Sequence, residues 1–257
     1  SEIAKRSGVM ENMPNVLSMA LGAGETSLID LTAAYASFVN GGKKIEPSLI
    51  DRIQDRRGKN IFLENFAACT NCDEPYIEEN PMPKLVNSSE SIFDEAKSYQ
   101  MVSILKGAVD RGTGRKTKID GIEIAGKTGT TNNNTDAWFI GFTSDLIIGV
   151  YAGFDKPKSL GKRETGSSVA VPIFRDFVKN YYQDKPILPF TIPNGIELIK
   201  INYDTGEIAS NFNSSESVYE AFSKSDNLVS SGEILVGSEG FQIIEVADEV
   251  MEEYVIY

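Results

Sequence analysis

Apolar and polar residues in the first part of the chain follow a pattern that predicts two helices with a strand pair between them. The stretch "TSLIDLTAAYASFVNGG" has helical spacing, with Ser27 as its N-cap, Asp30 three residues on, and Gly41-Gly42 as its stop. The stretch "PSLIDRIQDRRGKNIF" predicts two short strands joined at an Arg-Gly turn. A second helix is predicted over residues 91–109.

Other segments of this part carry residues that break regular structure. The first thirty residues predict short helical pieces, because Pro14, Gly22 and Gly24 interrupt them. Residues 70–90 are rich in Pro, Asn, Ser and acidic residues, which predicts a loop or an insertion.

The second part of the chain predicts a strand meander followed by a helix. Its strands are "IEIAGKTGT", "DAWFIGFTS" and "DLIIGVYAGFD", with a hairpin turn at residues 143–145, and its helix is "VAVPIFRDFVKNYY". A helix, three antiparallel strands and a last helix indicate a mixed α/β fold in which helices pack on an antiparallel sheet. After the Pro-rich "DKPILPFTIPNG", the pattern predicts short strands and polar turns. We therefore expect domains at 1–185 and 186–257, the second a small β-rich extension.

Composition limits the classes of function. With 257 residues and 41% hydrophobic content, the chain can bury a substantial core. Its formal charge of −12 disfavours nucleic acid and anionic membranes as partners. No apolar run is long enough to span a bilayer. Because the chain begins at a serine inside structured-looking sequence, we expect it to be a fragment that lacks an upstream part.

The absence of histidine restricts the chemistry further. Without imidazole, a Ser-His-Asp relay and the usual His-containing metal sites are excluded, so any base must be a lysine, a carboxylate or a tyrosine. Cys69 and Cys72 form a lone Cys-x-x-Cys, which lacks the two further soft ligands of a tetrahedral zinc site. We expect a local disulfide or two free thiols there, and no metal or cofactor.

The strand "AGKTGT" combines residues suited to an anionic substrate. Period-two alternation places the hydroxyls of Thr128 and Thr130 on one side and Lys127 on the other, while Gly129 leaves room for a ligand to approach. Threonine hydroxyls can donate to a carboxylate, lysine supplies positive charge, and a backbone N–H can donate to a developing oxyanion. A Lys-Thr-Gly run in an ordinary surface strand is the alternative.

Several motifs in order strengthen the functional interpretation. The runs "LGAGETSLIDLTAAYASFVNGGK", "GTG" at 112–114, "AGKTGTT", "DAWFIGFT" and "GVYAGFD" together resemble the C-terminal part of the transpeptidase domain of class A (bifunctional) penicillin-binding proteins, over about residues 1–182 and more weakly beyond. The resemblance implies a penicillin-binding transpeptidase or β-lactamase-like fold, incomplete at its N-terminus. It also implies a peptidoglycan D,D-transpeptidase that cross-links stem peptides by serine acyl transfer from D-Ala-D-Ala and is trapped by β-lactam antibiotics.

The resemblance also implies roles for individual residues. Thr130 would provide an oxyanion N–H, and Lys127 would act electrostatically. The substrate-binding residues would be Thr128, Gly129, Thr131 and Thr113. The parent protein would be anchored in the bacterial inner membrane, face the periplasm, and carry an upstream glycosyltransferase domain.

The nucleophile motif Ser-x-x-Lys and the second motif Ser-x-Asn are missing from their expected places before Lys127. Three strings match by chance, at Ser103–Lys106, Ser159–Lys162 and Ser225–Asn227. The first pair is expected on a solvated helix face, opposite an apolar arc formed by Met101, Val102, Ile104, Leu105, Ala108 and Val109. The second contains a glycine in a loop, and the third follows Lys127. We therefore expect no nucleophile in this chain, which would be inactive alone.

Two alternatives stay open. One is a β-lactamase-like or D,D-carboxypeptidase-type serine hydrolase, and the other is a non-catalytic binding or scaffold module. Among the remaining residues, Trp138, Phe139 and Phe142 are expected in the core. Residues 112–114 suit either a helix C-cap or a site wall, and residues 132–134 suit a mobile loop at the mouth of a cleft, with side-chain amides that have no assigned partner.

Overall fold

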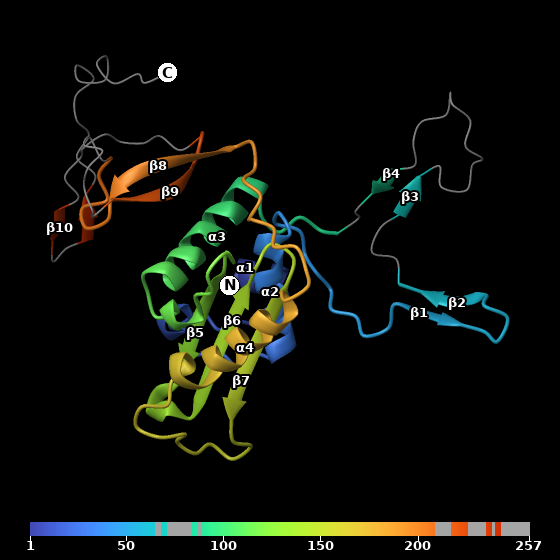
Figure 1. The fold of residues 1–257 in the computed structure, drawn as a ribbon. Helices are drawn as coiled ribbons and strands as arrows, with labels where there is room; N and C mark the ends of the chain where they lie inside the picture. The colour runs from blue at the N-terminus through green and yellow to red at the C-terminus, as the bar shows by residue number, and fades with distance from the viewer. Residues whose placement is uncertain are drawn as a thin grey trace. The chain divides into compact units, whose positions relative to one another are not determined.

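The computed structural model divides the chain into two compact units, Ser1–Asn194 and Gly195–Tyr257 (Figure 1). It describes residues 1–64, 68–70, 84–86, 89–208, 217–225, 235–237 and 240–242. Each unit is considered by itself below.

An antiparallel sheet forms the centre of the first unit. Its strands are β5 (Ala125–Thr130), β6 (Asp136–Phe142) and β7 (Ile147–Gly153), in the order β5-β6-β7. The turn between β6 and β7 forms as predicted, because the Thr143 N–H donates to the Leu146 carbonyl at 2.9 Å. Since β6 lies in the middle, β5 is an edge strand among the described residues.

Helices cover both faces of this sheet (Figure 1). On one face, α2 (Leu28–Val39) packs on β7 and α3 (Glu95–Asp110) packs on β5. On the other, a short π-helix, η4 (Gly166–Ala170), continues into α4 (Val171–Tyr181). The alternation along β6 explains the two layers.

Two fully buried phenylalanines of β6 serve the two faces. Phe142 joins the α2/α3 core, while Phe139 joins the α4 core and lies edge-on to Phe174, with 4.9 Å between ring centroids. Both were predicted as core residues, and both are confirmed.

Capping residues fix the helix starts. The Ser27 side chain accepts the Asp30 N–H and starts α2 as predicted. The predicted start of α3 at residue 91 is wrong, because the Asp94 side chain caps this helix by accepting the Lys97 N–H at 2.7 Å. The preceding residues are used elsewhere: Ser91 forms a β-bridge with Lys43.

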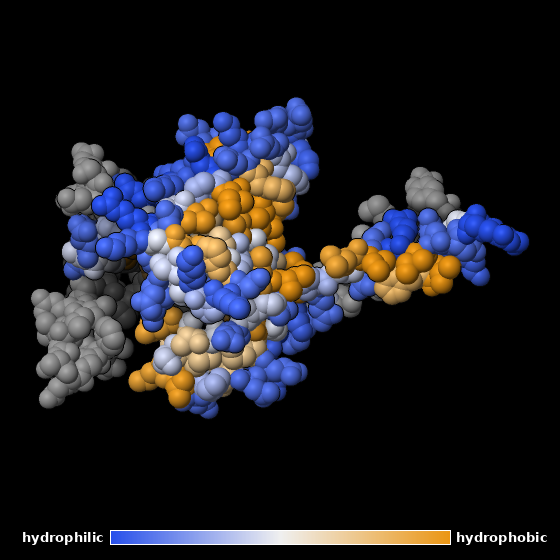
Figure 2. All heavy atoms as spheres, turned by 90° about the horizontal axis from the view of Figure 1, so that it is seen from below, coloured by the Kyte–Doolittle hydropathy of each residue, from blue (hydrophilic) through white to orange (hydrophobic). Residues whose placement is uncertain are grey.

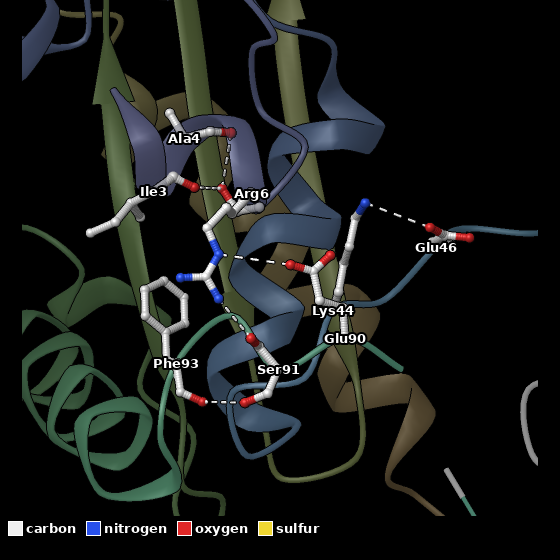
Figure 3. A network of polar contacts seen from close by, with 9 residues as sticks. Ile3, Ala4, Arg6, Lys44, Glu46, Glu90, Ser91 and Phe93 are labelled. Atoms are coloured by element: carbon white, nitrogen blue, oxygen red, sulfur yellow. Dashed lines mark hydrogen bonds and ion pairs between the residues drawn. The ribbon is translucent and has the colours of Figure 1, made fainter. Parts of the chain in front are cut away.

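Polar contacts join the residues next to that bridge, and Figure 3 draws several of them. The Lys44 N–H donates to the Glu90 carbonyl at 2.8 Å. The Arg6 guanidinium donates to the Ser91 carbonyl at 2.7 Å and lies 3.7 Å from the Glu90 carboxylate. The N-terminal helix is thereby tied to the segment just before α3.

Short elements complete the first unit. Strand β1 pairs with β2 and β3 with β4, and β4 falls in a segment predicted only as a loop or insertion, so part of that segment is a strand. These elements are α1 (Glu2–Arg6), η1 (Leu17–Leu21), β1 (Arg52–Gln54), β2 (Asn60–Leu63), β3 (Ala68–Thr70), β4 (Lys84–Val86), η2 (Arg115–Thr117) and η3 (Asn132–Asn134).

Large apolar side chains remain exposed on the first unit. Figure 2 shows apolar surface among hydrophilic side chains on the face that it views. The exposed fraction reaches 93% at Leu17 and 91% at Leu21, and Ile173 and Phe177 of α4 are also exposed.

The second unit is a small β structure. Strands β8 (Ile196–Asn202) and β9 (Ser217–Ser223) form an antiparallel pair, and β10 (Leu235–Gly237) pairs with β11 (Gly240–Gln242). Ile196 and Ala221 are its buried apolar residues among those whose side chains are described.

Candidate active site

The register of β5 against β6 decides where the candidate side chains lie. Thr128 lies opposite Phe139, and both therefore belong to the face that carries η4 and α4. Thr130, two residues on, lies on that same face, while Lys127 lies on the α2/α3 face. The structure thus separates the threonines from the lysine as the alternation predicts.

The turn after α3 brings a third threonine to this edge strand. The Thr113 and Thr128 hydroxyl oxygens are 2.7 Å apart, so one donates to the other. The turn itself is closed by the Gly114 N–H, which donates to the Ala108 carbonyl at 3.0 Å. The compact helix end predicted at residues 112–114 is present, and it places Thr113 against β5.

The start of η4 covers the end of β5. The Gly166 N–H donates to the Thr130 hydroxyl oxygen at 3.0 Å. A Cβ on Gly166 would lie 2.3 Å from the Trp138 carbonyl oxygen and 2.6 Å from that of Gly129, so only glycine allows this approach. η4 also has a reciprocal cap between Thr165 and Ser168.

Lys127 and Gly129 lie on the other face of the strand. The Lys127 side chain is exposed, and its ammonium donates to the Thr128 carbonyl at 2.8 Å. A Cβ on Gly129 would lie 3.1 Å from the Trp138 Cβ, so the space beside this glycine faces an indole. The positive charge therefore lies at the backbone of the same strand that carries the threonines.

The turn that follows β5 is anchored by its asparagines. Asn133 and Asn134 have left-handed φ values of 65° and 52°, which Asn tolerates better than most residues. The Asn134 side-chain amide donates to the Gly161 carbonyl at 3.0 Å, and the Asn134 backbone carbonyl accepts the Leu160 N–H at 2.8 Å. The Asn134 amide, to which the sequence assigned no partner, therefore has one in the structure.

Asp136, at the start of β6, collects hydroxyl donors that the sequence interpretation did not identify. The Tyr151 hydroxyl donates to Oδ1 at 2.8 Å, while those of Thr135 and Thr131 donate to Oδ2 at 2.8 and 2.9 Å. The hydrogen bond from Tyr151 lowers the pKa of Asp136 most. Together the three bonds outweigh burial, which raises this pKa, and hold it below its usual value. The Tyr151 pKa is raised for the same reason.

Trp138 differs from its prediction. It is only half-buried, and its ring lies 4.8 Å from that of exposed Tyr151. Trp138 lies opposite Gly129 on the α2/α3 face, and the prediction that it is buried in the core is wrong.

Ser103 and Lys106 of α3 are half-buried, whereas the prediction placed them on a solvated helix face. Val102, Leu105 and Val109 are buried, but Met101 and Ile104 are 37% and 61% exposed, so the predicted apolar arc is wrong at these two residues. The residues of α3 that pack against β5 therefore form a narrower row than the predicted apolar arc.

Lys106 is engaged with a carboxylate. Its ammonium forms an ion pair with Glu123, which also accepts the Phe190 N–H at 3.0 Å. Burial raises the pKa of Glu123, but the bonds from Lys106 and Phe190 outweigh it and lower this pKa. The Lys106 ammonium is therefore engaged in an ion pair.

The remaining candidate strings lie in a loop or partly outside the described residues. Ser159 and Lys162 are exposed in a loop. Ser225 is described, but Asp226 and Asn227, like Cys72, lie outside the described residues. No cluster of metal-ligating side chains is found in the described part of the chain.

Comparison with known proteins gives the family. Residues 4–179 match the family described as "Penicillin binding protein transpeptidase domain". The chain belongs to this family. It is 46% identical over 213 residues to penicillin-binding protein 1A of Rickettsia conorii, covering 80% of this chain and 26% of the relative. It is 39% identical to the Rickettsia typhi protein of that name, covering 98% of this chain and 32% of the relative.

A solved structure of this family has the same fold. The crystal structure of penicillin-binding protein 1A from Haemophilus influenzae matches with a TM-score of 0.70 and 29% identity, covering 85% of this chain and 35% of that one. The family and the mixed α/β fold expected from the motifs are thus confirmed. The chain spans about a quarter to a third of the length of the curated relatives described above. Among the described residues, no helix is both long and apolar enough to cross a membrane.

Proposed function

We propose that this chain supplies the substrate-carboxylate wall of a peptidoglycan D,D-transpeptidase. The longer protein would transfer the acyl group of a D-Ala-D-Ala stem peptide to a serine and then to an amine of a second stem. The observation that carries this proposal is the row of hydroxyls from Thr113, Thr128 and Thr130 beside an edge strand that also bears Lys127.

The hydrogen bonds of these hydroxyls leave protons for a ligand. Thr130 accepts the Gly166 N–H, so its own O–H is available to donate. Thr113 and Thr128 share one hydrogen bond, which leaves one of their two protons available. An ionised carboxylate accepts and cannot donate, so it suits this row. The cation of Lys127 adds long-range attraction.

The backbone of β5 supports the same proposal. An edge strand presents unpaired N–H and C=O groups, to which an extended peptide can add as a further strand. The Thr130 N–H would then donate to the oxyanion that forms when serine attacks the scissile carbonyl. Gly129 would allow the substrate backbone to approach, and β-lactams would occupy this place as mimics of the dipeptide.

The nucleophile would come from outside this chain. None of the described Ser-x-x-Lys strings offers a serine beside an unpaired lysine on a regular element. We accordingly place the Ser-x-x-Lys and Ser-x-Asn motifs upstream, in a parent that also carries a membrane anchor and a glycosyltransferase domain and acts at the periplasmic face of the inner membrane.

Acylation by a fluorescent penicillin tests this function in a protein that joins the chain to its upstream part. Thr130→Pro removes the oxyanion N–H and should reduce the acylation rate roughly 10²–10³-fold, whereas Thr130→Ala keeps this N–H and should lose much less. Equal rates for the two variants would show that the oxyanion is held elsewhere. The 257-residue chain alone should show no penicilloyl adduct by intact mass. An adduct on Ser103 would overturn the assignment.

A further inference from the structure

We propose that Asp136 is a positioning residue that fixes the end of β5 and so aims the Thr130 N–H. Its carboxylate is the point at which side chains from three segments meet: Thr131 after β5, Thr135 in the turn, and Tyr151 on β7. The inference rests on the proposed function, because that function requires the Thr130 N–H as an oxyanion donor.

Backbone and side-chain hydrogen bonds both connect Asp136 to the end of β5. The Thr131 N–H donates to the Asp136 carbonyl at 3.2 Å, and the Asp136 N–H donates to the Thr131 hydroxyl oxygen at 2.9 Å. The Thr131 hydroxyl in turn donates to the Asp136 carboxylate at 2.9 Å. Residue 131 is therefore held at three points, directly beside Thr130.

These bonds also turn the Thr131 side chain away from a substrate. A hydroxyl has one proton to donate, and here that proton has two internal acceptors, the Asp136 carboxylate and the Thr135 oxygen at 2.7 Å. Thr131 was expected to bind substrate from the resemblance. Its geometry instead assigns it to the turn, where it carries the influence of Asp136 to β5.

The backbone conformation of the turn requires contacts that hold it. The turn holds two consecutive asparagines with left-handed backbone, a conformation that persists only where surrounding contacts enforce it. Tyr151 extends the tie to β7, since its hydroxyl reaches Asp136 at 2.8 Å and its ring packs on Trp138. An oxyanion donor must be held within a fraction of an ångström, because a displacement of about 1 Å can cost about 10² in rate.

Two experiments on Asp136→Ala separate positioning from general stability. In the 257-residue chain, amide hydrogen exchange at Thr131, whose N–H donates to the Asp136 carbonyl, should accelerate at least about tenfold, while the thermal midpoint and exchange in α4 stay near wild type. In the longer protein, the acylation rate constant for penicillin should fall about 10–100-fold with little change in the concentration giving half-maximal rate. Asp155→Ala, which removes an exposed carboxylate near the same strand end, is the matched control and should change neither.

Further variants keep the inference testable if Asp136→Ala fails to fold. Thr131→Ser retains the hydroxyl and should acylate near the wild-type rate, whereas Thr131→Ala should share the loss. Tyr151→Phe removes one donor and should show a smaller loss. Wild-type exchange and acylation in Asp136→Ala or Thr131→Ala would overturn the inference. If the wild-type longer protein is not acylated at all, the proposed function fails, and the exchange measurement alone decides whether Asp136 holds the strand end.

Discussion

Replacing Gly166 with alanine tests the contact between η4 and the end of β5. The added Cβ would lie 2.3 Å from the Trp138 carbonyl oxygen, about 0.7 Å short of the 3.0 Å that such contacts require. Both neighbouring carbonyls belong to sheet backbone, so η4 must move instead. A displacement of this size would stretch the 3.0 Å hydrogen bond from Gly166 to Thr130 beyond bonding distance.

The stability cost follows from two effects. Overpacking a closely fitted site costs about 1–3 kcal/mol, and loss of one hydrogen bond costs about 0.5–1.5 kcal/mol. We expect a total of about 2–4 kcal/mol. For a unit of this size, each kcal/mol lowers the thermal midpoint by about 2–4 °C, so the midpoint should fall by roughly 4–16 °C.

Thermal unfolding followed by far-UV circular dichroism measures this effect, with Ser167→Ala as the control. Ser167 lies next in η4, is half-buried, and has no side-chain hydrogen bond among the described residues. The control should change the free energy of unfolding by no more than about 0.5 kcal/mol, so its midpoint should stay close to wild type. If Gly166→Ala and Ser167→Ala unfold at the same temperature, the close approach of η4 to β5 is not present in solution.

Three further predictions concern the scaffold. Phe139→Ala should lower the free energy of unfolding by about 3–5 kcal/mol in urea titrations, whereas Phe154→Ala, at an exposed position, should change it little. Asp94→Ala should cost about 1 kcal/mol at neutral pH. Because the Lys97 N–H lowers the Asp94 pKa, that difference should vanish as the pH falls below about 4. Burial and a hydrogen bond to a carboxylate raise the pKa of Tyr182 to about 12, so wild type should lose stability relative to Tyr182→Phe as the pH rises from about 10 to 12.

The sequence predicts best the features that depend on near neighbours. Ser27 and Gly41-Gly42 bound α2 as expected, since a cap and a left-handed stop are local signals. The alternation along β5 correctly separates Thr128 and Thr130 from Lys127, because the side-chain period of a strand needs no knowledge of its partners.

Features that depend on distant partners were not predictable in the same way. The Asp136 network joins residues 15 positions apart through Tyr151, and the contact of Gly166 with Thr130 spans 36 positions. The start of α3 differs from the prediction because Ser91 pairs with Lys43, which lies far before it in the sequence. Asp136 did carry one signal, since an aspartate that follows a threonine at the start of a strand can accept local hydroxyl donors.

Acid–base chemistry is the part of the proposed reaction that this chain is least equipped to supply. The sequence has no histidine, and the carboxylate nearest the end of β5, Asp136, is held ionised by three hydroxyl donors. Lys106, on α3, is paired with Glu123. Lys127 is the lysine of β5. An ionised carboxylate and charged lysines can orient and stabilise anions, but activation of a serine requires a neutral base within hydrogen-bond reach. We therefore expect this half of the site to contribute transition-state charge stabilisation and substrate placement, and the upstream half to contribute both the nucleophile and its base.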